Sequence, residues 1–189
     1  MAKARETIEK PQGSKLTYIA PARQVPDSAD APVVPIGTCW ELFTDRVMGG
    51  LSQGILIRDT VAGRPATRMR GVVSLENNGG FVQMGLDLVA SPGTFDASVY
   101  LGVELDVIGN DQDYNVHLRT DALSRPWESY RQSFRADGQW RTIQLRFEKF
   151  LPHRTDIPLD THSLRRIGIA AIGRAFTVDL TVGGVRFFR

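Results

Sequence analysis

Two stretches of sequence decide the fold: WELFTDRVMGGLS from Trp40 to Ser52, and ENNGGF from Glu76 to Phe81. Each combines a pair of adjacent glycines with large apolar residues. Glycine loses more conformational freedom on folding than any other residue, so a glycine pair indicates backbone that takes positive φ or is approached closely. We therefore expect two turns that shape the fold, and we find no catalytic motif in either stretch.

The same residues carry a resemblance to a known family. In this order along the chain they resemble the signature of the complex I intermediate-associated protein family: Trp40, Asp45, Arg46, Val47, Met48, Gly49, Gly50, Ser52, Asn77, Asn78, Gly79, Gly80 and Phe81. Further similarity at 109–114, 138–140 and 166–168 extends the resemblance over residues 36–188. The mitochondrial member of this family helps to assemble NADH:ubiquinone oxidoreductase. The resemblance implies a galactose-binding-like jelly roll and respiratory complex I subunits as partners.

Composition places the chain among soluble globular proteins. Its 189 residues are enough for one domain with a proper core, and 42% of them are hydrophobic and 23% charged. The net charge of +2 argues against a polyanion binder. Arginine, which pairs with carboxylates and stacks on aromatic rings at interfaces, greatly outnumbers the four lysines, Lys3, Lys10, Lys15 and Lys149. This bias fits either an interaction surface or a GC-rich genome.

The expected location is cytoplasmic and peripheral to the inner membrane. A single cysteine, Cys39, excludes an internal disulfide and fits a reducing compartment. No apolar run is long enough for a membrane span, and the N-terminus lacks the apolar core of a signal peptide. We expect membrane association only through a partner.

Residues 1–35 differ from the rest of the chain, and we expect two regions. This segment has mixed charges and five prolines, and its apolar residues do not recur with the period of a strand (2 residues) or of a helix (3.6 residues). It therefore cannot bury enough apolar surface to order itself. We interpret it as an extended N-terminal arm that becomes ordered on a partner chain. Residues 36–189 then form the complex I intermediate-associated-like β-sandwich domain.

From Ile36 onward, short apolar runs separated by turn residues predict an all-β fold, an antiparallel β-sandwich or jelly roll. We see no long amphipathic helix, and we interpret Leu151–Pro158 as a loop. The Asp137-Gly138 dipeptide predicts a type I′ hairpin. The expected strands are Trp40–Phe43, Gly54–Arg58, Thr67–Leu75, Phe81–Leu86, Leu101–Ile108, Tyr114–Thr120, Ser129–Arg135, Gln139–Phe147, Leu164–Ala171 and Thr177–Phe188.

Alternation along three of these strands predicts a polar, arginine-rich sheet face. It places the aromatic residues Tyr114, Tyr130 and Phe134 inward. The candidate polar face consists of Asn115, His117, Arg119, Arg131, Arg135, Gln144 and Arg146. Such a face is either simply solvated or meets an acidic partner or ligand.

The Asp45–Ser52 stretch contains a carboxylate, an arginine and a hydroxyl, but a hydrolase also needs a histidine beside Ser52. No spacing pairs His117, His153 or His162 with Ser52, so we predict no catalytic residues and no enzyme. In the structural interpretation, Asp45 and Arg46 pair or cap backbone groups at a glycine turn. In the alternative, Met48 and its neighbours dock a partner, because exposed methionine adapts to binding surfaces.

The Asn77–Gly80 stretch is rich in residues that tolerate left-handed backbone, and it predicts a tight turn that seats Phe81 in the core. The run from Asp111 to Asn115 begins like a calcium loop, but Val116 and Ala122 replace the required glycine and glutamate. No cysteine and histidine set has zinc spacing, and no dinucleotide fingerprint follows a strand. We predict no metal and no cofactor.

Three functions remain open. The resemblance favours a non-enzymatic accessory or assembly protein that binds respiratory complex I through protein–protein contacts. A carbohydrate-binding module is the first alternative, although sugar platforms need exposed rings. An RNA-binding domain is the second, since arginine with stacked aromatics could bind single strands; the near-neutral charge makes nucleic acid an unfavoured partner.

Overall fold

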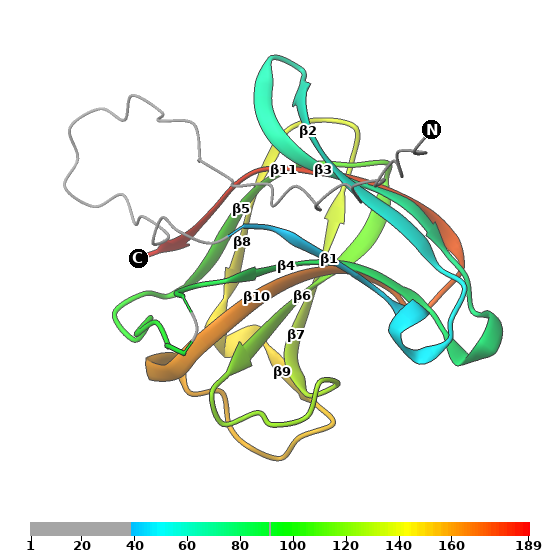
Figure 1. Ribbon diagram of the computed structural model, residues 1–189. Coiled ribbons are helices and arrows are strands. Elements are labelled where there is room, and N and C mark those ends of the chain that lie inside the picture. The colour runs from blue at the N-terminus through cyan, green and yellow to red at the C-terminus, as the bar shows by residue number, and fades with distance from the viewer. Residues whose placement is uncertain (1–38, 91) are drawn as a thin grey trace, which may run out of the picture.

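The computed structural model describes residues 39–90 and 92–189, and the arm expected over residues 1–35 lies outside them. In this part of the chain the elements are strands and short 3-10 turns (Figure 1). The strands are β1 (Glu41–Thr44), β2 (Gln53–Val61), β3 (Arg64–Val73), β4 (Phe81–Asp87), β5 (Gly102–Ile108), β6 (Gln112–Thr120), β7 (Ser129–Ala136), β8 (Arg141–Arg146), β9 (Leu151–His153), β10 (Leu164–Ile172) and β11 (Phe176–Phe188). The 3-10 turns are η1 (Asp45–Met48), η2 (Glu76–Asn78), η3 (Phe147–Lys149) and η4 (Thr161–Ser163).

The strands form two antiparallel sheets. One sheet has six strands in the order β1-β4-β10-β6-β7-β9, and the other has five in the order β2-β3-β11-β5-β8. Strands that follow each other along the chain often belong to different sheets, as β5 and β6 do. This is an all-β sandwich with a jelly-roll arrangement, which confirms the predicted fold class.

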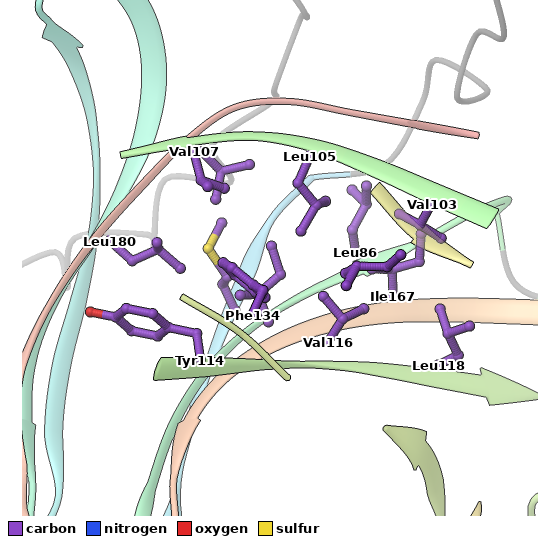
Figure 2. Close-up of a cluster of buried hydrophobic side chains, with 14 of the residues drawn as sticks. Leu86, Val103, Leu105, Val107, Tyr114, Val116, Leu118, Phe134, Ile167 and Leu180 are labelled. Atoms are coloured by element: carbon purple, nitrogen blue, oxygen red, sulfur yellow. The ribbon is translucent and has the colours of Figure 1, made fainter. Parts of the chain in front are cut away.

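Alternating side chains fill the space between the sheets. On β5, Val103, Leu105 and Val107 are buried, and on β6 the same is true of Tyr114, Val116 and Leu118. Figure 2 shows these two sets pointing toward each other from opposite sheets, with Phe134 of β7 among them. Because side chains alternate along a strand, the residues between them face outward. Tyr114, Tyr130 and Phe134 are all buried, as the inward placement predicted for them requires.

Each of the ten expected strands has a counterpart, with ends that differ by a few residues. One strand was missed. Leu151–His153, expected as part of a loop, forms β9 and pairs with β7 at the edge of the six-stranded sheet. Pro152 lacks an N–H and so discourages a strand prediction, but an edge position tolerates this loss.

The hairpin predicted at Asp137-Gly138 is wrong. It would join β7 to β8, but these strands lie in different sheets, and Gly138 does not take a positive φ. Instead the Asp137 side chain accepts the Gln139 N–H at 3.0 Å while the chain crosses from one sheet to the other. The β2–β3 hairpin, which projects from the sandwich in Figure 1, has its positive φ values at Ala62 (46°) and Gly63 (78°).

Candidate functional site

The two glycine-containing stretches meet at the carboxylate of Asp45. Asp45 begins η1 immediately after β1, and its side chain is fully buried. Its Oδ1 accepts the Ser52 N–H at 3.0 Å, and its Oδ2 accepts the Ser52 hydroxyl. From the second stretch, Oδ2 also accepts the N–H groups of Gly80 at 2.5 Å and Phe81 at 3.2 Å. One carboxylate therefore joins the β1–β2 turn to the β3–β4 turn, which lie side by side in Figure 1.

Asp45 is held in its ionised form. Burial raises the pKa of its carboxyl, but the hydrogen bonds from Ser52, Gly80 and Phe81 outweigh burial and lower the pKa below its ordinary value. Hydrogen bonds to a charged acceptor are the stronger kind, so this cluster fixes both turns. Asp45 thus caps backbone groups, while the Arg46 side chain points to solvent and makes no ion pair with it within the described chain.

The hydrogen bonds of the Ser52 hydroxyl hold the two turns in place. It is fully buried, donates to Asp45 and accepts the Ser74 N–H at 3.0 Å. Among residues 39–90 and 92–189, no histidine hydrogen-bonds to it. Nucleophilic catalysis needs a base within hydrogen-bond reach of the hydroxyl, so this Asp–Ser pair does not form a catalytic triad.

The glycines make room for the carboxylate. A Cβ at Gly79 would lie 2.5 Å from Asp45 Oδ2, and one at Gly50 would overlap the same side chain. Gly49 and Gly80 have φ values of 87° and 138°, and Asn77 and Asn78 both have 56°. The Asn77 amide donates to the Gly49 carbonyl at 3.3 Å and so ties the two turns a second time. These residues serve close approach and left-handed backbone.

Trp40 and Phe81 flank the two turns differently. Trp40 is buried in the core. The expectation that Phe81 also sits in the core is wrong, because it is only partly buried. Strand alternation explains the difference: the next residue, Val82, points inward, so Phe81 lies on the outer side with Gln83.

The rigid turn presents apolar side chains to solvent. Val47 is 79% exposed and Met48 is 64% exposed, although both lie within one turn of the buried Asp45. An open groove of about 730 Å³ lies between β1, η1 and the outer side of β2, β3 and β11, and Val47 lines it together with Ile55 and Val72. Three further exposed apolar residues stand within four positions of these along the chain. We call the six residues the apolar patch: Val47, Met48, Leu51, Ile55, Val72 and Leu75.

Sequence reasoning pointed to Met48 and its neighbours in the glycine stretch, but not to the strand residues of the apolar patch. Ile55 and Val72 lie in strands whose two faces are both partly apolar, so alternation alone could not show which face is wet. Large exposed apolar surfaces are uncommon on soluble monomers, so we treat the apolar patch as a candidate interaction site.

The predicted polar face is divided between the two sheets. Asn115, His117 and Arg119 of β6 and Arg131 and Arg135 of β7 do share the outer face of the six-stranded sheet. Gln144 and Arg146 do not, because β8 belongs to the five-stranded sheet. The error follows from the hairpin wrongly expected between β7 and β8.

Most of the predicted polar residues are paired within the protein. Arg135 binds Asp111 at 3.0 Å and Asp113 at 3.2 Å. Arg119 donates to four backbone carbonyls of the β6–β7 loop, at distances of 2.7 to 3.0 Å. Asn115 accepts the Ser133 hydroxyl, Gln144 donates to Glu104, and Arg146 pairs with Glu148. His117 and Arg131 remain, and neither has a carboxylate partner in the described chain.

No group of three or more histidine, cysteine, aspartate or glutamate side chains is arranged to hold a metal within residues 39–90 and 92–189. Over the same residues, no helix has the length and apolar character to cross a bilayer.

Comparison with solved structures identifies the architecture. A family 11 carbohydrate-binding module from Clostridium thermocellum, solved with a mixed-linked tetrasaccharide, aligns with a TM-score of 0.62 at 15% identity, over 79% of this chain and 88% of that chain. A family 30 module of a cellulosomal cellulase from the same organism aligns with a TM-score of 0.58 at 16% identity, over 84% and 92%. At this identity the likeness shows the fold alone.

Comparison with curated proteins gives no match. A comparison with protein-family models does identify the chain. The model described as complex I intermediate-associated protein 30 matches residues 36–182, which include both glycine stretches and all eleven strands except the end of β11. The chain therefore belongs to the complex I intermediate-associated protein 30 family.

Proposed function

We propose that this protein is a non-enzymatic accessory or assembly protein that binds subunits of respiratory complex I through protein–protein contacts. The family supports this partner, since its description names an intermediate of complex I. The observation that carries the proposal is the apolar patch, in which exposed Val47 and Met48 are held by the buried Asp45 cluster. A turn fixed before binding loses little conformational freedom when a partner covers it.

In this proposal the protein works at the cytoplasmic side of the inner membrane and reaches the membrane only through its partner. Residues 1–35 add a second contact by becoming ordered on a partner chain. The absence of a base beside Ser52 within the described chain supports a role without catalysis.

The test is affinity purification from solubilised native membranes. We expect NADH dehydrogenase subunits to copurify with the full chain. Val47→Asp should lower their recovery at least about tenfold, because a charge would be desolvated in the contact. Val99→Asp is the matched control, since Val99 is 64% exposed but lies outside the apolar patch. Removal of residues 1–35 should weaken the capture.

Both valine variants should melt at the temperature of the natural chain, because both side chains are exposed. Equal recovery with Val47→Asp and Val99→Asp would count against the apolar patch as the contact. Capture of soluble polysaccharide or RNA, without dehydrogenase subunits, would replace the proposed function itself.

Carbohydrate binding is the second candidate, and the shared fold with carbohydrate-binding modules favours it. Sugar platforms need exposed aromatic rings. Tyr114, Tyr130 and Phe134 are buried, so they cannot supply such a platform. Trp127, 49% exposed in the β6–β7 loop, is a ring that could stack on a sugar.

A further inference from the structure

The outer face of the six-stranded sheet places a histidine with an unpartnered buried nitrogen next to an arginine that has no ion pair among the described residues. His117 of β6 and Arg131 of β7 are directly opposite in the strand register. On the other side of β6, Gly168 of β10 lies opposite His117 in the strand register. Gly168 has no side chain, and the Gln83 amide lies over it. None of these residues lines the groove beside the apolar patch.

Arg131 has a cationic side chain without an anion. It is partly buried, and its Nε donates to Ser129 Oγ at 2.9 Å. No carboxylate in residues 39–90 and 92–189 lies within ion-pair distance of it. Burial and the nearby charge of Arg154 lower the pKa of Arg131. A partly desolvated guanidinium with free donors is costly, and an external anion would relieve that cost.

His117 adds an orphaned nitrogen. The side chain is 7% exposed, and its Nε2 is buried without a hydrogen-bond partner in the described chain. Burial lowers the pKa of His117 to about 3, and the charges of Arg131 and His153 act in the same direction. The imidazole is therefore neutral, and its buried polar atom needs a partner.

The surroundings of this pair are positively charged. Arg119 of β6 and Arg165 of β10 make no ion pair among the described residues, and neither does Arg154, which follows β9. Acidic residues nearby are engaged elsewhere: Asp87 binds Arg166 at 2.6 Å, and the Glu128 carboxylate accepts the Arg125 N–H at 2.9 Å. Arg135 shows the contrast, since on the same strand and face it is neutralised by Asp111 and Asp113.

We propose that His117, Arg131 and Arg154, together with the Gln83 amide, form a binding site for a phosphate group. The Arg131 fork is the main contact, because a guanidinium binds phosphate oxygens bidentately. The phosphate oxygens accept hydrogen bonds, so a doubly charged phosphate can pair Nε2 of His117 in the tautomer that carries its proton there, once the Arg131 side chain turns toward the ligand. The other cations nearby favour two negative charges over one.

The test uses the full chain and isothermal titration with inorganic phosphate and with glycerol 3-phosphate, at ionic strength fixed with sodium chloride. Arg131→Gln should weaken binding at least about tenfold. Arg135→Gln is the matched control, because it removes the same charge from the same strand and face, and it should change affinity by less than about twofold. Melting temperatures in chloride establish that both variants fold.

A second arm measures cosedimentation with phosphatidylcholine vesicles, with and without phosphatidic acid. A binding heat measured on titration with either soluble phosphate would identify the ligand as a free metabolite. Binding to phosphatidic acid vesicles alone assigns it to a lipid headgroup. In both cases Arg131→Gln should weaken binding at least about tenfold, and Arg135→Gln should keep it.

Absence of binding in both arms would overturn the proposal, and so would equal losses in Arg131→Gln and Arg135→Gln. The Val47→Asp variant should bind phosphate as the natural chain does. Failure of the phosphate site is thereby separable from failure of the complex I contact.

Discussion

Replacement of Asp45 with alanine should lower the free energy of unfolding by about 3–5 kcal/mol, the largest effect expected from any single change here. The carboxylate accepts hydrogen bonds from Ser52, Gly80 and Phe81, and it is fully buried. Without it, these N–H groups stay buried with no acceptor, and each orphaned donor costs about 1–3 kcal/mol. Urea denaturation followed by circular dichroism measures the change.

The matched control for this prediction is Asp113→Ala. Asp113 is an exposed carboxylate with one ion pair, to Arg135 at 3.2 Å, and its loss should change stability by no more than about 1 kcal/mol. Asp45→Asn should also be destabilising, because the amide NH₂ would face N–H donors. An Asp45→Ala protein within about 1 kcal/mol of the natural chain would contradict the role assigned to the carboxylate.

The second large effect concerns acid. The pKa of His117 is about 3 in the folded protein, against an ordinary value of 6.5. Between these pH values the unfolded chain binds a proton that the folded chain does not. Stability is therefore unaffected by this group above pH 6.5 and falls as the pH is lowered through the interval, at up to about 1.4 kcal/mol per pH unit. His153, whose pKa is also lowered, adds a loss of the same sign.

The measurement is urea denaturation at a series of pH values between 4 and 8. Above pH 4 the measurement reports on the histidines and not on Asp45. The stability that Asp45 contributes is present above pH 3.8, the pKa of this carboxyl in the unfolded chain, and is lost only as the pH falls through the lower pKa of the folded state. His117→Gln should flatten the pH dependence below 6.5 while its stability relative to the natural chain stays constant above pH 7. An unchanged slope in His117→Gln would refute the assignment.

Local patterns were enough to predict most strands, because alternation marks which side chains face the core. The same patterns could not assign strands to sheets. The chain crosses between sheets at Asp137-Gly138, and this crossing separated Gln144 and Arg146 from the polar face. Short β9 was hidden by Pro152, which only an edge strand tolerates.

The candidate site was predictable in part. The first glycine stretch was enough to predict that Asp45 caps backbone groups at its own turn. The same carboxylate also binds Gly80, 35 positions later, and no local signal reports such a contact. Likewise, side-chain alternation along the strands predicted an arginine-rich face. Only the ion pairs reveal that Arg135 is neutralised while Arg131 is not.

The order of strands within the sheets determines when the domain can form during synthesis. β10 lies between β4 and β6, and β11 lies between β3 and β5, so the last two strands of the domain fill the middle of both sheets. Until β10 has left the ribosome, β4 and β6 each expose an unpaired edge, and β3 and β5 do so until β11 has left it. Such edges invite aggregation. The nascent chain should therefore depend on chaperones for longer than a domain of the same size whose sheets grow from one end.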